Sequence, residues 1–520
     1  MPGQLQWNRR TLLGGLGGAA LLAPLGLRAQ GFDVTPFQLG VAAGDPAPDG
    51  FVIWTKLAPA PLEADGGMPR RPVEVGWEVA RDAGFRTVVQ RGVAIARPEL
   101  AHAVHVEVTG LEAGRPYWYR FVAFGERSFV GRAATAPAPT ADVQQLRFGV
   151  AGCQHYEEGW FHAFAALADQ ELDFLFHYGD YIYEYAPAPP LRMLRGRPFS
   201  PVRRHLGGET YSLADYRLRY AQVKTDPDLQ RAHAACAWFV TFDDHEIENN
   251  WAADRDESGT PPEIFLLRRA AALQAWYEHM PVRRSAFPRA GGLRMHRHAS
   301  WGRLLDAHFL DTRQYRSDQA CGDGDKALCD MARDPARTLL GWEQERWLAQ
   351  GLARSESRWN LLAQQVLMMD LDLGNAPGAR EPIFSMDTWG GYPAARERLL
   401  GHIADQRVRN LVVLTGDAHQ HFAGNLRQKD GPVLGTEFLT TSASSGGDGA
   451  GALPGNDVIL SRNPDLKLLE DRRGYSICTL TPQSWTTDMV ALDQVTERRS
   501  PRTTNHRFVV EHGVPGIVAS

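Results

Sequence analysis

The sequence predicts an α/β domain preceded by a smaller all-β region. Three observations lead to this prediction. Short alternating strand patterns occupy the first part of the chain, a Pro-rich linker follows them, and buried apolar runs then alternate with helical patterns. Alternation of apolar and polar residues indicates half-buried strands, and continuous apolar runs separated by helices are typical of a parallel sheet. A chain of 520 residues is long enough for roughly two to four domains.

Residues 1–29 have the features of an export signal. Arg9 and Arg10 precede an apolar, Gly-rich run from Gly14 to Leu27, and Ala29 is a small residue at a plausible cleavage point. This arrangement is typical of a secretory signal peptide, and the paired arginines indicate the twin-arginine export machinery. The alternative is a chance arginine pair before a core helix, which so Gly-rich a run would form poorly. We therefore expect a periplasmic or secreted protein. No other stretch has the roughly 18 uncharged apolar residues of a membrane span, so no stable membrane anchor is expected after cleavage.

Residues 35–135 are expected to form an N-terminal β-sandwich of fibronectin type III kind. Strand patterns occur at 50–55, 73–79 and 103–108, and a turn followed by the strand from Pro116 to Phe121 is typical of such sandwiches. Residues 134–140 (Ala-Thr-Ala-Pro-Ala-Pro-Thr) have the composition of a linker.

The larger domain, expected over 145–505, contains four apolar strand patterns that each end in candidate metal ligands. The strands at 146–151, 174–178, 237–242 and 411–415 are followed by Cys153, by Asp180 and Tyr183, by Asp243, Asp244, His245 and Glu246, and by Asp417 and His419. Helices are expected at 266–280 and 340–352. Sites in α/β sheets form at the carboxyl ends of strands, so these clusters should converge in one crevice. One such cluster alone is more often structural, but four together indicate a metal site.

The types of ligand suggest two different cations. Asp180, at a strand end, is the natural bridge between two ions. The thiolate of Cys153 and the phenolate of Tyr183 together favour a trivalent ion such as Fe(III). Asp244 and Asp417 would then hold a second, harder divalent ion.

The remaining cysteines differ in their surroundings. Cys321 and Cys329 bracket a polar loop rich in turn formers, where an oxidising compartment would permit a local disulfide, and the sequence leaves open whether it forms. Cys236 is expected to be a small buried hydrophobic residue, and Cys478 a strand residue.

The composition excludes several classes of protein. Lys and Arg number 56 against 61 Asp and Glu, which gives a net charge of −5 with no long run of one sign. General nucleic-acid binding would require a basic face and is not expected. With 51 Gly, 33 Pro and 43% hydrophobic residues, the chain has ordinary globular composition, unlike that of disordered or collagen-like proteins.

The ligand clusters resemble the motif series of the metallophosphoesterases. The opening Gly152-Cys153-Gln154, and Asp417 in place of the first His of the last motif, make the chain similar to the alkaline phosphatase D (PhoD-like) family. The matching segments are 152–154, 179–183, 243–246 and 416–419, with further matches at 37–46, 310–316, 387–393 and 437–446. The resemblance covers essentially the whole chain. It implies a metallophosphoesterase-type two-sheet α/β sandwich after the small β-sandwich.

The resemblance also implies a set of ligands for two metals. The Fe(III) ligands would be Cys153, Asp180, Tyr183 and His419, and the Ca²⁺ ligands would be Asp180, Asp244 and Asp417. The usual remote His of the second metal has no obvious counterpart. Asn250, or Gln364 or Gln365 after the strand at 359–363, could supply an oxygen, which calcium tolerates because its coordination is flexible.

The implied reaction is hydrolysis of a phosphoester. A hydroxide formed on the metal centre would attack phosphorus in line, while the cations neutralise charge that grows on the phosphoryl oxygens. His245 would protonate the leaving alkoxide or bind phosphate; alternatively, it would orient Asp244. Arg313 is a candidate phosphate ligand, unless it pairs with Asp311.

Several alternatives stay open at this point. Monoesterase and phosphodiesterase activity both fit, and a phospholipase D-like phosphodiesterase is the nearest alternative enzyme. A non-catalytic cell-envelope binding protein is the alternative from another class. The leaving group would depend on the loops at 184–230 and 446–470. The first loop contains Arg192, Arg195, Arg197, Arg203 and Arg204. These arginines could favour anionic substrates, although solvated surface charge is the simpler explanation.

Overall fold

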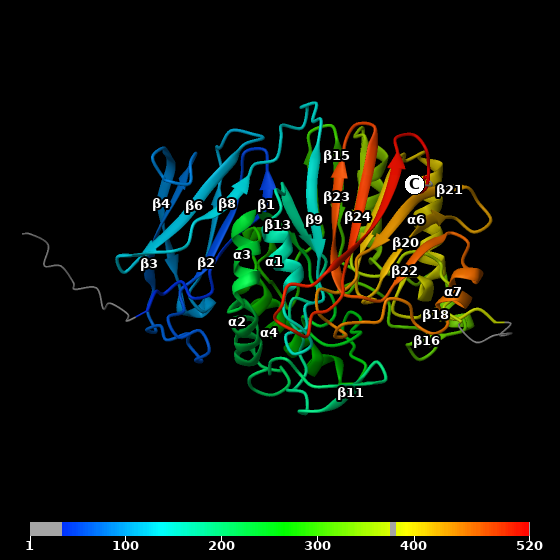
Figure 1. Ribbon diagram of the computed structural model, residues 1–520, viewed down its shortest axis with the longest axis horizontal. Helices are drawn as coiled ribbons and strands as arrows, with labels where there is room; N and C mark the ends of the chain where they lie inside the picture. Colours follow the sequence, from blue (N-terminus) through cyan, green and yellow to red (C-terminus); the bar gives the residue numbers. More distant parts are fainter. Residues whose placement is uncertain (1–33, 375–380, 519–520) are drawn as a thin grey trace, which may run out of the picture.

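The computed structural model describes residues 34–374 and 381–518. The signal peptide expected over 1–29 lies outside the described residues. The fold is mixed α/β, with several sheets and a β-rich N-terminal region, and this confirms the predicted fold class (Figure 1). Two small ribbons, β11–β12 (Arg192–Leu194, Arg197–Phe199) and β16–β18 (Asp325–Lys326, Phe384–Ser385), lie outside the main sheets.

The first main sheet is nine-stranded and contains three of the strands that precede the candidate ligands. In spatial order it consists of β25 (Thr503–Glu511), β24 (Ser484–Leu492), β23 (Gly474–Leu480), β9 (Leu146–Ala151), β10 (Phe174–His177), β13 (Ala237–Val240), β1 (Val41–Ala47), β2 (Gly50–Lys56) and β5 (Ala103–Val108). Strands β9, β10 and β13 are parallel, so their carboxyl ends share one edge of the sheet. In Figure 1, β9 points down toward the side of the molecule where β11 lies.

The second main sheet is seven-stranded and carries the remaining ligand strand, β19. Its order is β14 (Arg297–Trp301), β15 (Leu305–Phe309), β17 (Trp359–Ala363), β19 (Leu411–Thr415), β21 (Val433–Leu439), β20 (His421–Arg427) and β22 (Leu466–Glu470). Strands β15, β17, β19 and β21 are parallel. The two sheets pack face to face through a shared apolar core, in which the Phe309 ring lies 5.6 Å from Phe176 and 4.4 Å from Phe239.

Helices cover the outer faces of both sheets. The α-helices are α1 (His162–Ala168), α2 (Leu213–Lys224), α3 (Pro227–Ala235), α4 (Pro262–His279), α5 (Trp342–Arg354), α6 (Pro393–Asp405) and α7 (Asn456–Arg462). Helices α1–α4 pack on the nine-stranded sheet, and α5 and α6 pack on the seven-stranded sheet. On α5, Leu348 and Leu352 are one turn apart and both face the sheet, which is the 3.6-residue pattern that predicted this helix. The helices expected at 266–280 and 340–352 are therefore confirmed with small shifts in their ends.

The N-terminal region is joined to the larger domain by backbone hydrogen bonds. Strand β1 pairs in parallel with β13, with Ala43 opposite Ala237 and Gly44 opposite Trp238. A Cβ on Gly44 would lie 2.0 Å from the Pro281 carbonyl oxygen, so only glycine fits at this close approach. The other sheet of this region consists of β4 (Val88–Ala96), β3 (Val73–Ala80), β6 (Pro116–Ala123) and β7 (Glu126–Arg127), with β8 (Gly131–Ala134) on β6. The expected β-sandwich thus shares one of its two sheets with the larger domain, and the domain boundaries themselves stay a prediction.

The structure settles the disulfide that the sequence left open and confirms the expectations for Cys236 and Cys478. Cys321 and Cys329 form a disulfide with their Cα atoms 5.8 Å apart. Cys236 and Cys478 are free and buried, and Cys478 lies on β23. The loop that the disulfide closes contains Asp323, which contacts the candidate site described below.

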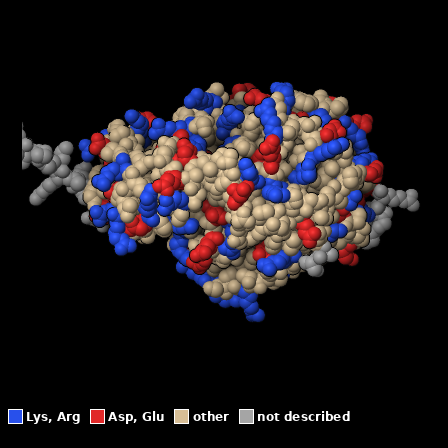
Figure 2. Space-filling view, turned by 90° about the horizontal axis from the view of Figure 1, so that it is seen from above, with Lys and Arg blue, Asp and Glu red and all other residues tan. Residues whose placement is uncertain are grey.

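Two observations concern membrane-spanning helices and surface charge. Within 34–374 and 381–518, no helix combines the length and the apolar character that crossing a bilayer requires. On the face that Figure 2 shows, Lys and Arg side chains are interspersed with Asp and Glu.

Candidate metal centre

The loops after β9, β10 and β19 bring the four predicted iron ligands together around one carboxylate. The Asp180 Oδ2 atom accepts hydrogen bonds from the Cys153 thiol at 3.2 Å and from the Tyr183 hydroxyl at 3.0 Å. His419 Nε2 lies 3.1 Å from the Tyr183 oxygen and 3.9 Å from Asp180 Oδ2. All four residues therefore contact at least one other member of the group, although they come from both main sheets.

The backbone at these positions is unusual. Cys153, Asp180, Asp417 and His419 have positive φ angles of 50°, 55°, 68° and 57°. Non-glycine residues rarely adopt this conformation, which costs of order 1–3 kcal/mol, and such residues cluster at functional sites. Strain at these four positions supports a functional role for the group.

The two Gly-Asp motifs require glycine at their first position for steric reasons. A Cβ on Gly179 would lie 2.5 Å from the Asp243 backbone nitrogen, and a Cβ on Gly416 would lie 2.1 Å from the Tyr178 ring. Real Cβ atoms do not approach so closely, so only glycine lets the two ligand loops pack against these neighbours.

A second group of carboxylates lies beside the first and surrounds one buried guanidinium. The Arg313 side chain is fully buried. Its partners are Asp243 Oδ1 at 2.5 Å, Asp387 Oδ1 at 2.8 Å, Asp244 Oδ1 at 3.3 Å and Asp417 Oδ1 at 3.4 Å.

These contacts differ from the two considered for Arg313 from the sequence. Its guanidinium is buried and surrounded by carboxylates. Asp311 contacts Arg313 through the backbone: its carboxylate accepts the Arg313 backbone N–H at 3.0 Å, and it also accepts the backbone N–H and side-chain amide of Gln314. Arg313 instead balances part of the negative charge around Asp244 and Asp417.

The site carries more carboxylate charge than one arginine can neutralise. Burial, reinforced by nearby Asp244, raises the pKa of Asp180 to about 7. Burial and neighbouring carboxylates raise the pKa values of Asp243 and Asp417 well above their usual range, against the opposing effect of Arg313. Burial also raises the pKa of the Cys153 thiol and lowers that of His419 to about 3. A bound cation would oppose the effect of burial on the carboxyls and the thiol, because it favours their ionised forms, and it would reinforce the neutral form of the His419 imidazole.

His245 is positioned by an acidic residue that the sequence analysis missed. Its Nδ1 atom lies 2.8 Å from Glu184 Oε2, and its Nε2 atom lies 3.9 Å from Asp244 Oδ2. Burial disfavours the charged imidazole, but Glu184, Asp244 and Asp180 outweigh it and raise the pKa of His245 well above the ordinary value. Glu184 directly follows Tyr183 in the sequence, so its adjacency to the motif was the available signal.

The candidate oxygen donors for the second metal lie in different places. The backbone N–H of Asn250 donates to Asp244 Oδ2 at 2.8 Å, and its side-chain amide donates to Asp323 at 3.0 Å. Gln365 accepts from the Thr312 hydroxyl at 2.7 Å and donates to a backbone carbonyl. Gln364 accepts from the Trp389 indole at 3.0 Å. Of the three, Asn250 is the one in contact with a predicted calcium ligand.

The two loops that we expected to select the leaving group line one cavity. This cavity has a volume of about 490 Å³ and is lined by residues 194–200 and 446–450, together with Leu453 and Pro454. The hydroxyl of Ser445, the residue before the second lining segment, lies 3.5 Å from His419 Nδ1. Leu194 and Phe199 give the cavity an apolar wall.

Several arginines of the first loop are paired with carboxylates. Arg192 and Arg195 form ion pairs with Glu158 and Asp471. Arg203 pairs with Asp226 at 2.6 Å and packs over the Tyr156 ring. These pairings favour a structural role over direct attraction of an anionic substrate.

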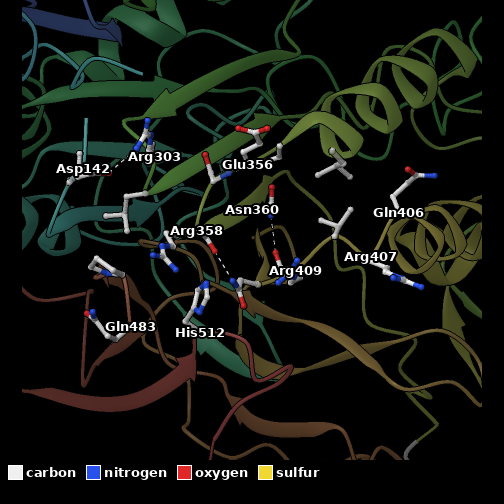
Figure 3. A pocket seen from close by; sticks show the side chains of 18 of the residues that line it. Asp142, Arg303, Glu356, Arg358, Asn360, Gln406, Arg407, Arg409, Gln483 and His512 are labelled. Carbon is white, nitrogen blue, oxygen red and sulfur yellow. Dashed lines mark hydrogen bonds and ion pairs between the residues drawn. The ribbon is translucent and has the colours of Figure 1, made fainter. Parts of the chain in front are cut away.

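A different cavity, of about 950 Å³, lies at the opposite ends of the parallel strands (Figure 3). Its lining residues Leu304, Arg358 and Asn410 directly precede β15, β17 and β19, whereas the ligand loops follow the carboxyl ends of strands. Figure 3 shows Arg358 and His512 among its side chains and none of the predicted site residues. The position of the ligands, not the size of the cavity, therefore locates the candidate site.

The donor set fits a pair of cations. One thiol, one phenol and one imidazole surround Asp180, which suits a trivalent or borderline ion. Asp243, Asp244 and Asp417 place carboxylate oxygens within 4.8 Å of one another. Asp244 Oδ1 is buried and accepts no hydrogen bond in the described part of the chain, although it forms an ion pair with Arg313 at 3.3 Å. Carboxylate oxygens of this kind suit Ca²⁺ or Mg²⁺.

Comparison with known proteins defines the class of enzyme. Residues 148–489 match the family model described as PhoD-like phosphatase, and residues 24–137 match the model of its N-terminal domain. The chain is therefore an enzyme of the phosphoesterase class.

Individual relatives specify the family. Alkaline phosphatase D of Bacillus subtilis (strain 168) is 46% identical over 493 residues, which cover 94% of this chain and 83% of that protein. A solved structure described as PhoD has a TM-score of 0.89 and 46% identity, and covers 93% of this chain and 91% of its own. The chain belongs to the PhoD-like phosphatase family.

Proposed function

We propose that this phosphatase is an exported, metal-dependent phosphoester hydrolase with a mixed iron and calcium centre. The observation that supports the proposal best is the shared carboxylate of Asp180, which accepts from Cys153 and Tyr183 and lies beside the carboxylates of the second group. Such a donor set, with soft and phenolic ligands on one side and hard oxygens on the other, suits two unlike cations.

We assign the residues to each cation as the family resemblance implies, and these contacts support the assignment. Fe(III) would be held by Cys153, Asp180, Tyr183 and His419, and Ca²⁺ by Asp180, Asp244 and Asp417, with Asn250 as a further oxygen donor. Bound cations of this kind acidify a water molecule and stabilise negative charge on phosphoryl oxygens.

The protein residues around this centre have separate tasks. Glu184 fixes the imidazole of His245 so that its Nε2 atom points toward the carboxylate group, where it can protonate the leaving alkoxide. Arg313 holds Asp244 and Asp417 in place through its buried guanidinium. Asp387 in turn accepts hydrogen bonds from Arg313 and Arg316, which fixes the orientation of Arg313.

The cavity lined by residues 194–200 and 446–450 supports phosphodiesters as substrates in addition to monoesters. Leu194, Phe199 and Leu453 could accommodate an organic group on the phosphate, as in a phospholipase D-like diesterase. The alternative of a non-catalytic cell-envelope binding protein is dropped, because the family match identifies the chain as an enzyme.

A panel of monoesters and diesters, with metal analysis of protein from the exporting host, tests the proposal. We expect about one iron per chain, bound calcium, and hydrolysis of both substrate classes. Protein that contains neither metal, yet hydrolyses phosphoesters at the full rate, would contradict the proposed centre.

The same panel tests His245. His245→Gln should slow alkyl esters by about 100-fold or more but aryl esters with good leaving groups much less, because only the poor leaving groups need a proton. An equal loss on every substrate would instead assign His245 to the orientation of Asp244.

Export through the twin-arginine machinery is the proposed route to the periplasm or medium. Arg9→Lys together with Arg10→Lys should retain the precursor in the cytoplasm, because the paired guanidinium groups form the signal. Cell fractionation measures this directly. Normal periplasmic accumulation of the double variant would indicate another secretion route.

A further inference from the structure

Another group of metal-ligand residue types lies on the outer face of the seven-stranded sheet. His298 on β14 and His308 on β15 pair directly across these antiparallel strands, and their rings are 5.0 Å apart. Asp306 lies two residues before His308 and therefore on the same face of the sheet. One ligand atom from each of the three lies within 4.8 Å of the others.

His308 is held with one ring nitrogen facing this group. Its side chain is 1% exposed, and its Nδ1 atom lies 3.7 Å from Asp306 Oδ1. Nδ1 has no hydrogen-bond partner among the residues that the structure describes. A buried polar atom without a partner costs about 1–3 kcal/mol, which a bound ion would offset.

Helix α5 is shaped to admit the His308 ring. A Cβ on Gly351 would lie 2.2 Å from His308 Nε2, so only glycine allows the imidazole to lie under the helix. Glycine inside a helix costs about 0.5–1 kcal/mol relative to alanine. The helix thus contains a destabilising residue at the position that keeps Nε2 against the helix and directs Nδ1 toward Asp306.

The other side of the group is open. The His298 side chain is 46% exposed, and it hydrogen-bonds through Nε2 to Asp306. It lines a cavity of about 460 Å³ together with His296 and Trp347. A metal bound here would have three protein ligands and room for water or a small ligand in a fourth position.

We infer that His298, Asp306 and His308 bind one divalent transition-metal ion of the Zn²⁺ class, at a site additional to the proposed phosphoesterase centre. Two imidazoles and one carboxylate with an open fourth position are the donor set of open zinc sites. The group contains no sulfur ligand, in contrast to the Cys153 site, so the two sites are chemically distinguishable.

Equilibrium dialysis of the mature protein, with its resident metals, against micromolar free Zn²⁺ tests this site. The wild type should bind one zinc per chain more than the His298→Ala and Asp306→Asn variants do. In both variants, the affinity of this site for zinc should fall at least about tenfold. His296→Gln is the matched control, because His296 lines the same cavity and contacts Trp347 but is not one of the three ligands. Asp180→Asn should keep the additional zinc although it disrupts the proposed catalytic centre.

The X-ray absorption spectrum of zinc distinguishes zinc bound at this site from zinc that replaces iron beside Cys153. The expected spectrum has only N/O neighbours at about 2.0–2.1 Å, whereas zinc beside Cys153 would show sulfur at about 2.3 Å. Equal zinc binding by the wild type and by folded His298→Ala protein, or a sulfur shell for the additional zinc, would overturn the inference. Since His298 is partly exposed, its substitution should disturb folding less than substitution of Asp306 or His308.

Discussion

Asp180→Asn should reduce phosphoester hydrolysis by at least about 1,000-fold, equivalent to about 4 kcal/mol, while the fold stays intact. Asp180 is the carboxylate that the Cys153 thiol, the Tyr183 hydroxyl and His419 all approach. An amide at this position has no charge with which to bridge two cations. Turnover and metal content of the purified variant measure the effect, and thermal melting monitored by circular dichroism checks the fold.

The matched control for this variant lies at the other end of the same strand. Asp173, just before β10, accepts the backbone N–H of Arg147 at 2.9 Å and contacts none of the candidate ligands among the described residues. Asp173→Asn should therefore keep both metals and wild-type turnover. If Asp180→Asn also retained both metals and most of the turnover, Asp180 could not be the bridging ligand.

Removal of calcium should abolish activity without removing iron. Asp244 and Asp417 offer hard carboxylate oxygens, which bind calcium with moderate affinity, so EGTA should extract it. Thiolate and phenolate bind Fe(III) tightly, so iron and its visible charge-transfer band should persist. Added Ca²⁺ should then restore turnover, measured in parallel with metal content and absorbance.

Two results would contradict this assignment of the second ion. Protein that stays fully active after EGTA treatment would show that calcium has no role in turnover. Recovery with Zn²⁺ but not with Ca²⁺ would place a different ion between Asp244 and Asp417.

The predicted ligands could be placed from the sequence because each follows a recognisable buried strand. Cys153, Asp180 and Asp244 come within a few residues of β9, β10 and β13, and parallel strands carry such residues to one edge. A short distance along the chain thus translated directly into proximity in space. The same reasoning located Asp417 and His419 after β19.

The charge balance of the site could not be inferred in this way. The sequence left Arg313 as either a phosphate ligand or a partner of Asp311, because its sequence neighbours do not show that its guanidinium is buried. Its contacts with Asp243 and Asp387 join segments 70 and 74 residues away, and only the folded loops determine them. Glu184 was missed for another reason: it adjoins Tyr183, but nothing local shows that it faces His245.

The pairing of β1 with β13 was also beyond the sequence, because alternation identifies a strand but not its neighbour. Strand patterns in the N-terminal region indicated a sandwich without showing that one of its sheets continues to β9 and β10.

That pairing has a consequence for how the protein can be divided. The family models meet between residues 137 and 148, yet the hydrogen-bonded ladder runs across this junction from β13 to β1, β2 and β5. A chain cut there would expose the β13 edge, an unpaired row of N–H and C=O groups open to aggregation. This strand leads into Asp243 and Asp244. The N-terminal region and the larger domain should therefore be expressed and exchanged together.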